Sequence, residues 1–188
     1  GLVATGYLAI APAVFDRVER GVDLDYTSEG MQAGIAIARG GGLDFAKVLA
    51  DARAAGRYAA KAGKVGITGY CWGGTVSWNA ACNPDGIACA VPYYGGGIPG
   101  MAEQQPKVPV MFHWGETDHS IPMDAVRKIE AAHPECISYV YAAGHGFNCN
   151  ERGSWDEAAA KTARERTIAF LHGFTQTGNS WKPIAIQG

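Results

Sequence analysis

A glycine-rich turn after a short apolar run constrains this chain most. Residues 64–68 read Lys-Val-Gly-Ile-Thr, which predicts a buried strand, and the next residues are Gly69-Tyr70-Cys71-Trp72-Gly73-Gly74. This is the Gly-x-nucleophile-x-Gly spacing, in which a sharp strand-to-helix turn lifts the central side chain above a sheet. Glycines are needed on both sides because side chains there would collide with the neighbouring strand and helix. The turn therefore predicts a parallel sheet with Cys71 projecting from it.

The rest of the chain fits an α/β fold. Short apolar runs alternate with longer amphipathic or alanine-rich stretches, the pattern of a parallel sheet covered by helices on both faces. We expect strands at residues 7–12, 64–69, 87–94, 108–114 and 137–141, and helices at residues 29–38, 45–60, 71–81, 122–132 and 155–174. A length of 188 residues with 47% hydrophobic side chains predicts one domain over residues 1–188.

Cys71 is the candidate nucleophile. The expected helix begins at this residue and directs its positive end at the sulfur, which lowers a thiol pKa. The backbone N–H of Trp72 is also placed to stabilise an oxyanion. The alternative is that Cys71 is a small buried hydrophobe, as free cysteines often are, and the flanking glycines favour the nucleophile. We expect structural roles for three other cysteines, which lack such a turn: Cys82, Cys89 and Cys136.

Two loops after later strands supply an acid and a base. Asp118 follows the strand at 108–114, and His145 follows the strand at 137–141 between two glycines. The order nucleophile, acid, histidine is the order used by the α/β-hydrolase fold. An imidazole beside Cys71 can take its proton, and a carboxylate behind the imidazole fixes its tautomer. Glu116 is the rival acid. His113 and His119 are expected to be structural residues of a strand and a loop. His133 and His172, at helix ends, are expected to be solvated.

These motifs, in this order, resemble the dienelactone hydrolases. The matching segments are Gly69-Tyr70-Cys71-Trp72-Gly73-Gly74, Gly115-Glu116-Thr117-Asp118-His119-Ser120-Ile121-Pro122 and Ala143-Gly144-His145-Gly146-Phe147. The resemblance extends to the strand that ends in Tyr93-Tyr94-Gly95 and to the last helix. It implies an α/β-hydrolase fold and an enzyme that opens a lactone through a thiol ester on Cys71. The type enzyme of the family converts dienelactone to maleylacetate in the breakdown of chlorinated aromatics.

The resemblance also bears on substrate binding and on the start of the chain. In the family an arginine shortly after the histidine helps to hold the substrate carboxylate; here Arg152 is the expected substitute, and Tyr94 is a further substrate-binding candidate. Residues 29–39 contain no convincing match to a second arginine of that carboxylate site. Family members carry strands upstream of the segment that resembles the beginning of this chain, including one that supplies a second oxyanion N–H and a glutamate partner for the cysteine. We therefore expect this sequence to be a fragment of a longer chain.

Composition narrows the functional classes. A net charge of −2 gives no broad basic field, so nucleic acid is not an expected partner, and the chain lacks the long apolar run of a membrane protein. Without a signal-peptide pattern, a cytoplasmic protein is expected. Five cysteines without Cys-x-x-Cys spacing predict neither a disulfide framework nor a zinc site, and the chemistry requires no metal or organic cofactor. The leading hypothesis is a hydrolase of a small ester or lactone. The alternatives are a general carboxylesterase or thioesterase and a non-catalytic ligand-binding protein.

Overall fold

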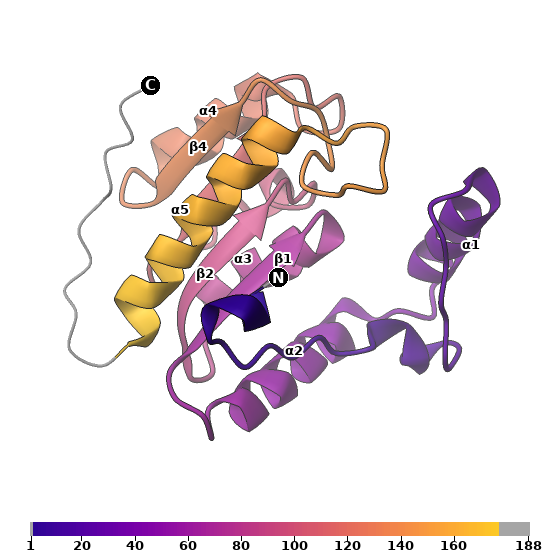
Figure 1. Cartoon of the computed structure of the whole chain (residues 1–188), viewed down its shortest axis with the longest axis horizontal. Helices are drawn as coiled ribbons and strands as arrows, with labels where there is room; N and C mark the ends of the chain where they lie inside the picture. Colours follow the sequence, from indigo (N-terminus) through magenta and orange to yellow (C-terminus); the bar gives the residue numbers. More distant parts are fainter. Residues whose placement is uncertain (1, 177–188) are drawn as a thin grey trace.

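A four-stranded parallel sheet forms the centre of the structure, a computed structural model that describes residues 2–176 (Figure 1). The strands lie in the order β1-β2-β3-β4 and comprise Val65–Tyr70, Ile87–Tyr93, Met111–Gly115 and Ile137–Tyr141. The α-helices of the described residues, α1 to α5, are Ser28–Arg39, Phe45–Ala59, Trp72–Cys82, Met123–Ala132 and Glu157–Thr175. Short 3₁₀ helices span Leu2–Thr5, Val14–Arg17 and Pro99–Met101. This alternation confirms the predicted parallel α/β fold.

Helix ends follow the local sequence signals. Thr27, Asp44 and Asp156 cap α1, α2 and α5, each with a side-chain oxygen that accepts a hydrogen bond from a backbone N–H of the first turn. Pro122 precedes α4, where its missing N–H costs no intrahelical hydrogen bond. Every predicted helix is therefore present, with its ends within about two residues of the expected ones.

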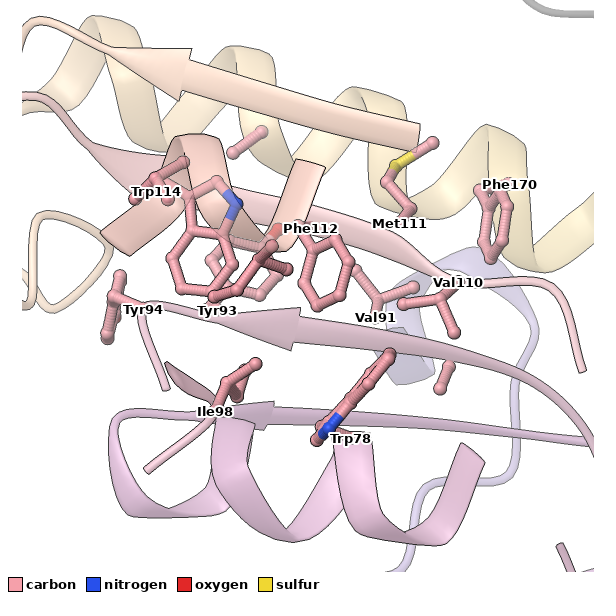
Figure 2. Close-up of a cluster of buried hydrophobic side chains, with 14 of the residues drawn as sticks. Trp78, Val91, Tyr93, Tyr94, Ile98, Val110, Met111, Phe112, Trp114 and Phe170 are labelled. Carbon is pink, nitrogen blue, oxygen red and sulfur yellow. The ribbon is translucent and has the colours of Figure 1, made fainter. Parts of the chain in front are cut away.

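Helices α3 and α5 pack on opposite faces of the sheet and enclose its core (Figure 2). Trp78 of α3 is fully buried and packs its ring against Phe112 of β3, whose ring in turn stacks on Trp114. Helix α3 also contacts α2, so that residues 74–82 of α3 are all buried. This double coverage explains why α3 lacks a polar face.

The face of β3 toward α5 carries a buried polar chain rather than only apolar groups. His113 is fully buried; its Nδ1 lies 2.8 Å from the hydroxyl of Tyr141, and its Nε2 lies 3.0 Å from the hydroxyl of Thr167. Arg166 donates a hydrogen bond to the Tyr141 hydroxyl, and Tyr93 shares one with Thr167. Burial, followed by the charge of Arg166, lowers the pKa of His113 to about 3. The imidazole is therefore a neutral member of the core.

Two sequence-based expectations about the strand at residues 7–12 and the burial of His133 were wrong. Residues 7–12 do not form a strand: they run as irregular chain, with Leu8 and Ile10 exposed, beside a cavity of about 650 Å³ along β1. Within residues 2–176, β1 pairs with β2 alone. A strand requires a ladder partner that no local pattern guarantees. His133 is not solvated but 1% exposed, and its Nε2 donates to the carbonyl of Ala102 at 2.6 Å.

None of the helices in the described part of the chain combines the length and the apolar character needed to cross a lipid bilayer.

The close packing of α3 on the end of β2 yields a stability prediction. A Cβ added at Gly74 would lie 2.3 Å from the carbonyl oxygen of Tyr93, so the helix would have to move. We expect Gly74→Ala to lower the free energy of unfolding by about 1–3 kcal/mol in urea titrations. The control is Gly73→Ala, whose added Cβ has no atom within 4 Å; it should leave stability unchanged or raise it by up to about 1 kcal/mol. Equal losses in both variants would contradict this packing argument.

Candidate active site

Cys71 occupies a strained turn between β1 and α3. Its backbone has φ 55° and ψ −118°, a positive φ that few non-glycine residues adopt, and its N–H donates to the carbonyl of Tyr93 at 3.1 Å. A Cβ at Gly69 would lie 2.1 Å from the carbonyl oxygen of Gly73. The first glycine of the motif is thus required by the approach of α3 to β1. The expected collision at the second glycine was wrong, because a Cβ added at Gly73 would meet no atom within 4 Å. The turn leaves the Cys71 side chain exposed, as the motif predicts.

His145 and Asp118 meet because β3 and β4 remain hydrogen-bonded beyond their ends. The N–H of Glu116 donates to the carbonyl of Tyr141 at 2.7 Å, and the N–H of Thr117 donates to that of Ala143 at 3.1 Å. Since both strands end at the same edge of the sheet, the loops that follow them lie together.

A continuous hydrogen-bonded chain links the three predicted side chains. The Nε2 of His145 lies 3.1 Å from the Sγ of Cys71, and its Nδ1 lies 2.7 Å from Oδ2 of Asp118. The other carboxylate oxygen of Asp118 accepts from the backbone N–H groups of Ser120 and Ile121, at 2.8 and 3.2 Å. Asp118 is 4% exposed, whereas the rival Glu116 lies exposed on the same loop. The structure therefore places Asp118, and not Glu116, beside the imidazole. The two backbone N–H groups hold the Asp118 carboxylate in one orientation.

The pair formed by Cys71 and His145 favours charge separation. The hydrogen bond from His145 lowers the pKa of Cys71, an effect that outweighs burial; the charge of His145, the backbone N–H of Trp72 and Arg152 act in the same direction. Reciprocally, the hydrogen bond to Cys71 raises the pKa of His145, with a further contribution from Asp118. The two titrations belong to the pair rather than to either group alone. The sulfur thus has thiolate character at a lower pH than an ordinary thiol.

The three thiols for which structural roles are expected show the opposite shift in pKa. Burial raises the pKa of Cys82 to about 11, and that of Cys89 and Cys136 to about 12, so these thiols stay protonated. All five cysteines are free. The described residues contain no group of three or more acidic, histidine or cysteine side chains arranged to hold a metal ion.

Arg152 and Tyr94, the expected substrate-binding residues, both lie near His145. The Arg152 side chain packs over Gly146, where an added Cβ would meet its Nη1 at 2.7 Å, and its charge reaches Cys71. Tyr94 is only 2% exposed, and its ring centroid lies 5.1 Å from that of His145. The guanidinium is thus at the rim of the site, whereas the phenol is beneath it.

One neighbour of the site had no signal in the sequence. Tyr26, from the segment before α1, lies near Cys149 on the His145 loop, and the interaction between these side chains raises the Tyr26 pKa. Residues around Tyr26 form no motif, and the contact joins parts of the chain that are far apart in sequence. Only the folded chain reveals it.

Comparisons with known proteins point to one enzyme family. The model of the dienelactone hydrolase family matches residues 1–175. The carboxymethylenebutenolidase of Pseudomonas putida is 33% identical over 180 residues, which cover 90% of this chain and 75% of the relative; that of Pseudomonas sp. strain P51 is 31% identical, with 90% and 74% covered.

Solved structures share the fold. A crystal structure from Klebsiella pneumoniae, provisionally assigned as a dienelactone hydrolase, has a TM-score of 0.65 and 30% identity over 70% of this chain. The chain spans 63% of that protein, less than two thirds of its length. An esterase of Pyrococcus furiosus, at 14% identity and a TM-score of 0.52 over 67% of this chain and 61% of its own, supports the α/β-hydrolase fold alone.

Alkylation of Cys71 tests the pairing with His145. Because the imidazole lowers the thiol pKa, we expect carboxamidomethylation by iodoacetamide to reach its half-maximal rate at a pH below the ordinary value of 9.0. His145→Ala should move this midpoint upward, whereas His119→Ala, on an exposed loop position, should leave it in place. Mass spectrometry of the Cys71 peptide across a pH series measures the rates. An unchanged midpoint in His145→Ala would refute the pairing.

Proposed function

This chain belongs to the dienelactone hydrolase family, and we propose that it cleaves a small ester or lactone through an acyl intermediate on Cys71. The family match and the curated relatives indicate a hydrolase that acts on ester or lactone bonds. The observation that carries the finer proposal is the chain of hydrogen bonds from Cys71 through His145 to Asp118, at 3.1 and 2.7 Å. A ligand-binding protein without turnover would have no need for this arrangement.

In the first half of the proposed reaction, the Cys71 thiolate attacks the substrate carbonyl. The carbonyl π electrons move to oxygen, and the backbone N–H of Trp72, at the first turn of α3, donates to the resulting oxyanion. When the tetrahedral species collapses, the bond to the alcohol or ring oxygen breaks. The imidazolium of His145 gives that oxygen its proton, leaving a thioester on Cys71.

In the second half, water completes the hydrolysis. Neutral His145 accepts a proton from a water molecule, whose oxygen attacks the thioester carbonyl. The carbon–sulfur bond breaks, the acid product leaves, and the thiolate–imidazolium pair is restored. Throughout, Asp118 accepts a hydrogen bond from Nδ1 of His145 and stabilises the imidazolium by its negative charge. The carboxylate can orient the ring because its other oxygen is held by two backbone N–H groups.

Arg152 supports a preference for substrates that carry a carboxylate. Its guanidinium packs over Gly146, next to His145, and is close enough to influence the charge on Cys71. A guanidinium recognises carboxylates through charge-assisted hydrogen bonds. We propose that Arg152 binds an acidic group on the ester or lactone.

Removal of the sulfur tests the nucleophile. Cys71→Ala should lower ester and lactone turnover by about 10³-fold or more and abolish the acyl adduct that intact-mass spectrometry detects in wild type with a p-nitrophenyl ester. Cys149→Ser, which alters the free thiol on the neighbouring loop, should retain both turnover and adduct. Turnover that survives in Cys71→Ala, or an adduct lost in Cys149→Ser alone, would refute Cys71 as the nucleophile.

Paired substrates test Arg152. With Arg152→Met we expect KM for a lactone or ester that bears a carboxylate to rise about 10-fold or more, as for the loss of a charged hydrogen bond. KM for the matching neutral ester should change less than about twofold. For the substrate with a carboxylate, KM of Arg152→Lys should lie between the values of wild type and Arg152→Met, because lysine keeps the charge but lacks the planar guanidinium. Equal effects on both substrates would exclude carboxylate recognition by this residue.

A further inference from the structure

We propose that Tyr94 is a positioning residue that holds His145 in line with Cys71 and Asp118. This inference rests on the proposed function, because it assigns a role within the same reaction. It gives Tyr94 a different task from the substrate contact expected from the sequence.

The backbone of Tyr94 is strained and lies between β3 and the turn that carries Cys71. It follows β2 directly and has φ 33°, one of two positive-φ non-glycine residues within the described range, the other being Cys71. Its N–H donates to the carbonyl of His113 at 2.8 Å, while the preceding carbonyl, that of Tyr93, accepts from Cys71. Positive φ at a bulky residue costs on the order of 1–3 kcal/mol, which glycine would avoid. The side chain at this position must therefore make contacts that offset the strain.

The Tyr94 ring packs against Tyr70 and Tyr93 and, closer still, against the loop that carries His145. The ring centroid of Tyr94 lies 5.1 Å from that of His145 and 5.3 Å from that of Phe147, the latter edge-to-face. Its hydroxyl also lies near the backbone N–H of Asn148, which acts to lower the phenol pKa against the larger effect of burial. The Tyr94 side chain thus lies against His145, Phe147 and Asn148 of the same loop.

The His145 loop needs such support because its own backbone is loose. Gly144 and Gly146 flank the histidine, and Gly146 has φ 79°. Glycines allow the loop to bring the imidazole over the sheet, but they also leave it many alternative conformations. Hydrogen bonds to Cys71 and Asp118 use the two ring nitrogens, and the ring plane is set by the packing of Tyr94. A displacement of about 1 Å in such a group can cost about 100-fold in rate.

Burial separates this role from substrate binding. Tyr94 is 2% exposed, and Phe147 behind it is fully buried, so a substrate above Cys71 meets the imidazole and not the phenol. Burial also raises the pKa of Tyr94 far above its usual range, so the hydroxyl remains neutral at every working pH. Figure 2 shows Tyr94 beyond Tyr93 at the end of β2, at the margin of the core.

The test compares Tyr94→Leu and Tyr94→Phe with a core control. Tyr94→Leu should lower kcat about 10- to 100-fold, with KM within about twofold, and should move the pH midpoint of Cys71 alkylation upward. Tyr94→Phe keeps the ring and loses only the hydroxyl near Asn148, so it should retain most of the wild-type kcat and alkylation midpoint. The control is Phe170→Leu, a buried substitution on α5, which should lower stability while leaving kcat and the midpoint as in wild type.

Two results would overturn the inference. One is a rise in KM with kcat unchanged in Tyr94→Leu, which would make Tyr94 a substrate contact. The other is an unshifted alkylation midpoint in Tyr94→Leu together with a kcat loss no larger than that of Phe170→Leu, which would make it a core residue only. Alkylation requires no ester turnover. A wild type that hydrolyses no ester would thus refute the proposed function, whereas the midpoint would still decide the role of Tyr94.

Discussion

Parallel pairing of β3 with β4 is the constraint on which the site depends. The ladder runs from Met111 opposite Ile137 to Gly115 opposite Tyr141 and continues into both loops. An added Cβ at Gly115 would lie 2.5 Å from the carbonyl oxygen of Ala143, so the loops touch backbone to backbone. The distance between Asp118 and His145 is therefore set by the pairing of β3 with β4. The turn with Cys71 is held to the same sheet by the hydrogen bond from its N–H to the carbonyl of Tyr93.

The sequence predicted those parts that local patterns determine. The turn around Cys71 requires glycine where β1 meets α3, and the loops with Asp118 and His145 follow apolar strands directly, so their meeting could be inferred from parallel topology. Contacts between residues that are distant in sequence could not be predicted in this way. Residues 7–12 form a short apolar run like that of a strand but find no ladder partner among the described residues. His133 is buried against a loop distant in sequence. No pattern in the amino-acid sequence identifies Tyr94 as a residue with a strained backbone.

Identical side chains acquire opposite properties through their surroundings. Cys71 stands at the start of a helix and beside an imidazole, and both favour its anion; Cys89 lies inside the sheet, where burial favours the neutral thiol. Local turn geometry, rather than residue type, separates the reactive sulfur from the inert ones.

The buried imidazole of His113 carries a consequence for acid tolerance. An unfolded chain would protonate this group near its ordinary pKa of 6.5, whereas the folded core holds the pKa at about 3. Between these values the unfolded state binds the extra proton, so the stabilisation present above pH 6.5 declines as the solution is acidified. Acid inactivation would then combine two separate events, reprotonation of the surface thiolate and loosening of the sheet from within.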